Sequence, residues 1–326
     1  MSGRKGTIST VWAGLLAVMV MGPLTPAEGK SVFAVASHQS SAIKAYSIEP
    51  DGVSYQGTFL NTQSFGAGAT GLCVWPSLDR LFVTYEGSPT IAWMSTKRLE
   101  WDPSHQLDIP ESNLAGLVAD ESKGLLYVMG RNTGHLFTLR FDAVADRLVM
   151  EYPGGQAYRV LAGLGNPTYG LALDDQAGLL FAANGSSIVR YYDTTTWERV
   201  GQVDVGRGAV GIDVDGAGYL YAGCFPASGG HTHLVRYLVT GDPNDPETRI
   251  EKNLGVVVTD ISIDRETGLL YATTRRVVNG RIGAVEVYDP TGWTAADPDG
   301  TLVLLDIESD ADFYGPAGIG VGSQYK

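Results

Sequence analysis

The stretch "GLALDDQAGLLFAA" (residues 170–183) decides the fold class of this chain. An apolar segment leads into a polar turn that contains Asp and Gly, and a second apolar segment with an aromatic residue follows. Gly readily adopts the positive φ of a tight turn, and Asp hydrogen-bonds the turn backbone. The stretch therefore predicts a β-hairpin.

The same hairpin recurs four more times, beginning at residues 71, 116, 211 and 260. The leading residue and the aromatic residue are 11 positions apart in four copies and 10 apart in the copy from 211. Successive aromatic residues are 45, 54, 40 and 50 positions apart: Phe82, Tyr127, Phe181, Tyr221 and Tyr271. A period of this length with short strands indicates a repeat architecture.

Each hairpin is followed by further strand-like segments. A third alternating segment is found at 135–142, 187–194, 233–240 and 284–291, and a weaker fourth at 198–205 and 301–307. Nothing between them reads as a long amphipathic helix. Four antiparallel strands per repeat predict the blades of an all-β propeller.

The last segment, "GPAGIGV" (315–321), begins like a hairpin but has no second strand after it. The missing partners lie at the other end of the chain, where 31–37 reads as a second strand and 42–48 as a third. Pairing the C-terminal strand with these N-terminal strands closes the ring and removes two exposed sheet edges. We therefore expect a six-bladed β-propeller of four-stranded antiparallel blades; a seventh blade would have to come from 142–166.

The N-terminus has the pattern of a secretory signal. Arg4 and Lys5 precede an apolar stretch at 8–21, which is too short for an ordinary membrane span, and Thr25-Pro26-Ala27 suits cleavage. We expect a signal peptide at 1–27, a single propeller domain at 28–326, and a secreted, periplasmic or extracellular protein. A retained N-terminal anchor is the alternative.

The net charge disfavours some classes of binding partner, and the positions of the cysteines indicate the state of their thiols. The formal net charge of −13 disfavours nucleic acid and anionic membranes, so neither nucleic-acid binding nor membrane insertion of the mature chain is expected. Cys73 and Cys224 are the two cysteines, both in apolar strand-like stretches. We interpret them as buried free thiols.

The repeat at 170–206 resembles the YVTN family of propeller repeats. In residues 170–206, "FAAN" (181–184) stands where that family has its name-giving tetrapeptide, and "YDTTTWERVGQVDVG" (192–206) follows the order of its third and fourth strands. The match is looser in the other repeats. The resemblance implies a propeller, often extracytoplasmic, but no reaction, because these residues build the blade.

A second comparison is with six-bladed gluconolactonase and regucalcin-like hydrolases. Proteins of that group hold a divalent metal on Glu, Asn and Asp residues near the starts of inner strands. Here Tyr169 precedes Gly170 where Asn is expected, Thr259 stands where the metal-binding Asp would be, and no Glu precedes Gly318. The metal-binding triad of that group therefore does not carry over.

One face of the predicted propeller gathers the starts of the inner strands and the loops between second and third strands, around the mouth of the central channel. This face is the default ligand surface. Its loops contribute His38, Glu86, Arg131, Asn132, Asn184, His231, His233, Arg275 and Arg276. Its strand starts contribute Thr70, Tyr169, Thr259 and Asp260. A solvated rim without ligand is the alternative interpretation.

Asp260 stands out because the other inner strands begin with glycine. Gly suits strands that crowd around a channel, whereas a carboxylate there must meet water, a cation or a donor. We expect Asp260 to face the channel mouth and to fix a polar ligand or ion, with Tyr169 and Arg275 nearby. The alternative is that Asp260 hydrogen-bonds neighbouring backbone N–H groups and only stabilises the strand.

Three segments raise the question of a metal. His231 and His233 are two positions apart and could share zinc, although no further ligand except Cys224 is evident nearby. The acidic segments 241–249 and 297–308 could hold surface calcium, but acidic hairpins are the favoured interpretation. A divalent cation, calcium or zinc, is thus an open alternative to having no cofactor.

No catalytic motif is evident. The sequence has no Gly-x-Ser-x-Gly, no His-Glu-x-x-His and no glycine-rich phosphate loop. We predict a secreted binding module whose channel-mouth face binds a polar small molecule, a glycan or a protein. The alternative is a lactonase-like propeller hydrolase or lyase, with a metal or a carboxylate and histidine site at the channel mouth.

Overall fold

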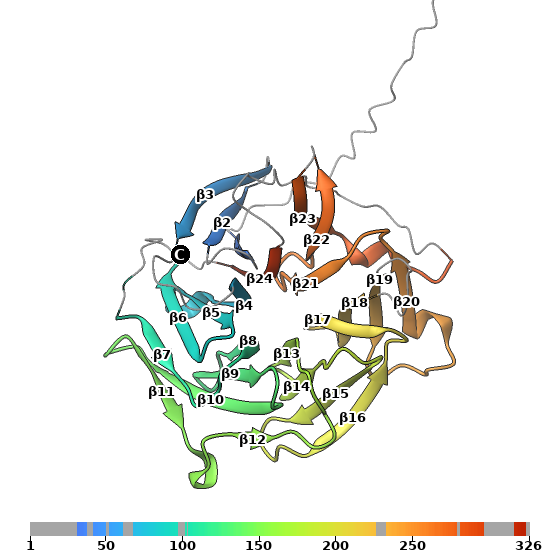
Figure 1. Cartoon of the computed structure of the whole chain (residues 1–326). Coiled ribbons are helices and arrows are strands. Elements are labelled where there is room, and N and C mark those ends of the chain that lie inside the picture. Colours follow the sequence, from blue (N-terminus) through green and yellow to red (C-terminus); the bar gives the residue numbers. More distant parts are fainter. Residues whose placement is uncertain are drawn as a thin grey trace, which may run out of the picture.

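Antiparallel strands surround one central axis in the computed structural model (Figure 1). The structure describes residues 31–37, 42–49, 52–60, 68–96, 102, 104–225, 233–278, 281–296 and 316–323. The strands form six sheets, each with one strand at the axis and its other strands farther out. The all-β propeller predicted from the repeats is therefore confirmed.

The sheets follow the chain in order. The first two full repeats are β4 (Gly68–Trp75), β5 (Arg80–Glu86), β6 (Thr90–Ser95) and β7 (Gln106–Asp108), then β8 (Leu114–Asp120), β9 (Leu125–Gly130), β10 (His135–Asp142), β11 (Arg147–Glu151) and β12 (Arg159–Val160). The next two are β13 (Leu171–Asp174), β14 (Leu179–Ala182), β15 (Ile188–Asp193) and β16 (Arg199–Asp204), then β17 (Gly208–Val214), β18 (Tyr219–Phe225), β19 (His233–Leu238) and β20 (Arg249–Asn253). The fifth is β21 (Val258–Ile263), β22 (Leu270–Val278) and β23 (Arg281–Tyr288).

The remaining sheet joins the two ends of the described chain. It has the order β24 (Pro316–Ser323), β1 (Ser31–Ser37), β2 (Ala42–Glu49), β3 (Gly52–Leu60). β24 pairs antiparallel with β1 over six consecutive residues, from Ser31 opposite Ser323 to Ala36 opposite Gly318. The predicted pairing of the C-terminal strand with N-terminal strands is therefore confirmed.

The expectation of six four-stranded blades needs correction. Five sheets have four strands or more, whereas the sheet β21-β22-β23 has three among the described residues. The segment 301–307, expected as its fourth strand, lies outside the described residues. The long insert at 142–166 adds no blade, because β11 and β12 both pair with β10 and together extend that sheet.

The inner strands β4, β8, β13, β17, β21 and β24 follow one another around the axis, each against the next (Figure 1). Glycine allows the closest approaches. A Cβ on Gly170 would lie 2.4 Å from the carbonyl oxygen of Val210, and one on Gly211 would lie 2.5 Å from the Cα of Asp260. These contacts explain why the chain has glycine at these two positions of the inner ring.

Apolar side chains between adjacent sheets form the core. Trp93, Trp293, Tyr127 and Phe181 are among its largest buried side chains. Cys73 and Cys224 are both buried and free, which confirms their interpretation as buried thiols. Within the described ranges, no helix is long and apolar enough to cross a membrane.

Candidate functional site at the central channel

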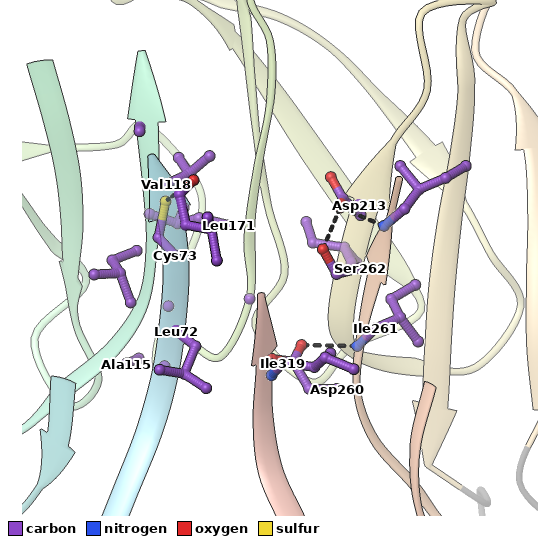
Figure 2. Close-up of a pocket in the computed structure, with 18 of the residues that line it drawn as sticks. Leu72, Cys73, Ala115, Val118, Leu171, Asp213, Asp260, Ile261, Ser262 and Ile319 are labelled. Carbon is purple, nitrogen blue, oxygen red and sulfur yellow. Dashed lines mark hydrogen bonds between the residues drawn. The ribbon is translucent and has the colours of Figure 1, made fainter. Parts of the chain in front are cut away.

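The inner strands enclose a cavity of about 720 Å³ along the axis (Figure 2). One wall is apolar and is formed by side chains of β4, β8 and β13, including Leu72, Val118 and Leu171. The facing wall is polar and carries Asp213, Asp260 and Ser262 from β17 and β21. A ligand inside the cavity would therefore meet an apolar surface on one side and carboxyl groups on the other.

Asp260 lies deep in the ring, and its side chain is partly accessible from the cavity. Its two carboxyl oxygens accept backbone hydrogen bonds from Ile261 (2.9 Å) and from Ile319 of β24 (3.1 Å). Removal from bulk water raises the pKa of Asp260 to about 8, although both hydrogen bonds act in the opposite direction. The backbone contacts expected of a structural Asp260 are thus present, and the same carboxyl also lines the cavity.

Asp213 is the second carboxyl on this wall, and the sequence analysis did not select it. It accepts backbone hydrogen bonds from Ile263 (2.8 Å) and Val214 (2.8 Å), and one from the Ser262 hydroxyl (3.2 Å). Desolvation raises the pKa of Asp213, while Arg265 acts to lower it. A signal was available, since Asp213 interrupts the apolar inner strand "GIDV" much as Asp260 does in "DISI".

Glu86, Arg131 and Tyr169 meet at the end of the cavity where the inner strands begin; we call this end the channel mouth. Arg131 Nη1 lies 2.6 Å from Glu86 Oε1, and the Arg131 guanidinium carbon lies 5.2 Å from the centre of the Tyr169 ring. Arg131 and Glu86 are each about one-quarter exposed. Three residues predicted for this face, from three different sheets, therefore form one polar cluster.

Gly185 also packs closely against the Tyr169 ring. A Cβ on Gly185, which has a φ of 75°, would lie 2.9 Å from Cε2 of the ring. Arg275 lines the same cavity and is exposed, and its backbone N–H donates to the carbonyl of Val257 (2.8 Å). The channel mouth thus combines a held aromatic ring, a paired arginine and an exposed arginine.

The opposite end of the cavity is lined mainly by acidic residues. Arg265 Nη1 lies 2.9 Å from Asp175 Oδ1, and its guanidinium also donates to the carbonyl of Leu173. Glu121 and Glu266 lie on the same end. The two ends therefore differ in charge, with arginines at the channel mouth and mostly carboxylates at the far end.

Other predicted site residues lie elsewhere. Asn184 stabilises its own turn, because its Oδ1 accepts from the Ser186 hydroxyl (2.6 Å) and its amide donates to the carbonyl of Leu164. His233 Nε2 lies 3.2 Å from Glu251, which also pairs with Arg207 and Arg249. His231 and His38 lie outside the described residues. The cavity lining includes neither Asn184 nor His233.

Of the segments considered as possible metal sites, the structure describes 241–249 but not 297–308. Within the part of the chain that the structure describes, no group of three or more His, Cys, Asp or Glu side chains could hold a metal ion. In segment 241–249, Asp242 accepts from the backbone of Asn244 (2.9 Å), and Asp245 caps the short helix Pro246–Thr248. Segment 297–308 lies outside the described residues. The carboxylates of Asp242 and Asp245 thus stabilise turns, as an acidic hairpin requires.

Comparison with known proteins supports the fold and little else. The sequence matches no protein-family model and no curated protein. A chain from the crystal structure of a nidogen/laminin complex superposes with a TM-score of 0.63 at 13% sequence identity, covering 90% of this chain and 99% of that chain. At this identity the likeness shows a shared β-propeller fold, and a fold does not determine a function.

Proposed function

We propose that this chain is an exported interaction module that binds a partner at the channel mouth. The observation that carries the proposal is a polar cluster at one end of the cavity of about 720 Å³, in which Arg131 and Tyr169 line the cavity and Glu86 pairs with Arg131. Arginine and tyrosine are enriched where proteins bind partners, because both offer large contact area and directed polar groups.

A protein segment is the partner class we favour. The structurally similar propeller comes from a nidogen/laminin complex, so this fold occurs in a protein–protein assembly. The exposed Arg275 and the partly exposed Arg131 favour a segment with a carboxylate, and the apolar wall behind them can accept a side chain. Glycans and polar small molecules are the competing ligands.

The proposal is tested by screening for ligands of the folded wild-type protein and then substituting residues at the channel mouth. Peptides from a displayed library and glycans on an array would be screened against the wild-type chain, and affinities measured for Arg275→Glu and Tyr169→Ala. We expect selected peptides to bind both variants at least about tenfold more weakly, as for loss of an interface anchor. Arg147→Glu, at an exposed position on β11, is the matched control and should bind normally.

Three results would be decisive. Peptides that bind Arg275→Glu and Tyr169→Ala as tightly as wild type would exclude the channel mouth as the binding surface. Binding of glycans alone would reject the protein partner while keeping the site. Equal weakening by Arg147→Glu would show that binding depends on overall charge and not on this face.

A hydrolase or lyase is the second candidate, favoured by one observation. Asp260 lines the cavity with its pKa raised to about 8, so it holds a proton at neutral pH and could act as a general acid. Turnover of a lactone or ester panel that is abolished in Asp260→Asn, with the variant folded, would establish this activity. Metal analysis of the purified protein would show whether a divalent ion takes part.

A further inference from the structure

Two arginines approach one point in the seam between the sheet of β8–β12 and the sheet of β13–β16. Arg190 lies on β15 and Arg199 at the start of β16, where it is paired in register with Tyr192. Alternation along β15 places Arg190 and Tyr192 on the same face of the sheet, and Arg199 lies opposite Tyr192 on that face. This face carries two positive charges beside each other.

The turn that follows β12 completes the site. The Tyr192 hydroxyl donates to the carbonyl of Ala162 (3.1 Å) and holds the turn against β15. A Cβ placed on Gly163 would lie 3.1 Å from Nη1 of Arg199 and 3.7 Å from Nε of Arg190, with no other atom within 4 Å beyond its chain neighbours. Both guanidinium groups therefore border the same small space, and Gly163 is exposed.

In the part of the chain that the structure describes, no carboxylate pairs with either arginine. Among the described residues, neither arginine side chain forms an ion pair or a hydrogen bond, and Nε and Nη1 of Arg190 are hidden from solvent without a partner. Buried polar groups are nearly always hydrogen-bonded, and two close guanidinium groups repel each other. In a chain of net charge −13, acidic side chains are abundant, yet none of those that the structure describes pairs with either arginine.

We propose that Arg190, Arg199 and the Gly163 turn form a binding site for an oxyanion group, either a tetrahedral phosphate or sulfate or a planar carboxylate. Each guanidinium offers a planar fork of N–H donors that matches such oxygens, and one anion would partner both arginines and remove their repulsion. The site lies outside the channel and does not depend on the function proposed for the channel mouth.

The test measures anion-dependent stability of the full chain. Melting temperatures would be recorded in sodium sulfate, inorganic phosphate, sodium acetate and sodium chloride at equal ionic strength for the wild type, Arg190→Gln and Arg199→Gln. Sulfate and phosphate stabilise proteins generally through exclusion from the surface, so the informative quantity is the difference between variants. Arg147→Gln, also on an outer strand but 3.9 Å from Asp142, is the matched control.

We expect sulfate, phosphate or acetate to raise the melting temperature of the wild type and of Arg147→Gln more than that of either seam variant. A response to sulfate and phosphate alone identifies a tetrahedral ligand, and an equal response to acetate identifies a carboxylate. Without these anions, Arg190→Gln should melt at or above the wild-type temperature, since an unpaired charge is removed. Identical anion responses in all four proteins would overturn the proposal, and so would a wild type that responds to none.

Discussion

Asp260 both connects two inner strands and lines the cavity. It occupies the position where the neighbouring inner strands have glycine, and its carboxyl connects β21 to β24 through the backbone N–H of Ile319. It also lines the cavity. The repeat pattern identified the position as unusual, but the sequence could not show that the donor is Ile319, which lies 59 positions away and reaches Asp260 only when the ring closes.

The raised pKa of Asp260 gives a pH-dependence with a defined sign. The folded state keeps the proton up to about pH 8, whereas the unfolded chain loses it near the ordinary value of 3.8. Between these values unfolding releases a proton, so the free energy of unfolding falls as pH rises, by up to about 1.4 kcal/mol per pH unit from this group. The contribution is complete below pH 4 and lost above pH 8.

Asp260→Asn should therefore flatten the pH profile of stability between pH 5 and 8. The neutral amide cannot titrate, so the variant should gain stability relative to wild type as the pH rises from 5 to 8. Urea denaturation at several pH values measures this directly. Asp193→Asn at the end of β15 is the control: backbone N–H groups of Thr196 and Thr195 lower the pKa of Asp193, so this substitution should leave the slope unchanged between pH 5 and 8. Parallel profiles for wild type and Asp260→Asn would show that Asp260 is ionised throughout this range.

At the scale of elements, local patterns located most strands. The third-strand segments predicted at 135–142 and 187–194 correspond to β10 (His135–Asp142) and β15 (Ile188–Asp193). Hairpins are predictable because turn chemistry and alternation are properties of neighbouring residues. Local patterns could not predict that the insert 142–166 extends the sheet of β10, because β12 pairs with the start of β10 through a long-range contact.

The candidate site was predictable only in part, for the same reason. Topology places Glu86, Arg131 and Tyr169 at one opening, and the structure brings them into contact. Asn184 also lies close to that face, but its side chain is used by its own turn. Which polar residue faces a ligand and which stabilises a loop depends on side-chain direction, which sequence spacing does not determine.

Closure of the ring depends on one element, β24. It pairs with β1 along one edge and donates to Asp260 of β21 along the other. Deleting 315–326 should expose an apolar edge of β1 and leave Asp260 without one of its two donors. We expect aggregation, or a large fall in melting temperature across the whole protein, because every inner strand contacts the next.

The matched control for this deletion removes only 324–326, the residues after β24. Circular dichroism melting and size-exclusion chromatography would compare both truncations with the parent chain. The short truncation should behave as the parent. A 315–326 deletion that stays monomeric and melts at the parent temperature would show that β24 contributes little to the closed ring.

At the scale of the whole molecule, the residues that build the sheets are different from the polar residues that we propose bind a ligand. Glycines and buried aromatic residues build the repeated sheets, whereas the polar residues that we consider for binding lie at the channel mouth, in the cavity and in the seam beside Gly163. Arginine appears in all three of these places, although the chain is strongly acidic. We infer that the acidic surface repels non-specific anionic partners, while a few arginines select a particular one.

Where the molecule meets such a partner depends on export, which gives the final prediction. The basic residues Arg4 and Lys5 and the apolar stretch 8–21 should direct the chain across a membrane, with cleavage after Ala27. N-terminal sequencing of the protein from its native cell should then read from Glu28. Leu15→Arg places a charge in the centre of the apolar stretch and should keep the precursor in the cytoplasm, because a charged side chain there is costly to insert into the membrane. Mature protein that begins at Met1 or Ser2 in the cytoplasm of the wild type would show that these residues are not an export signal.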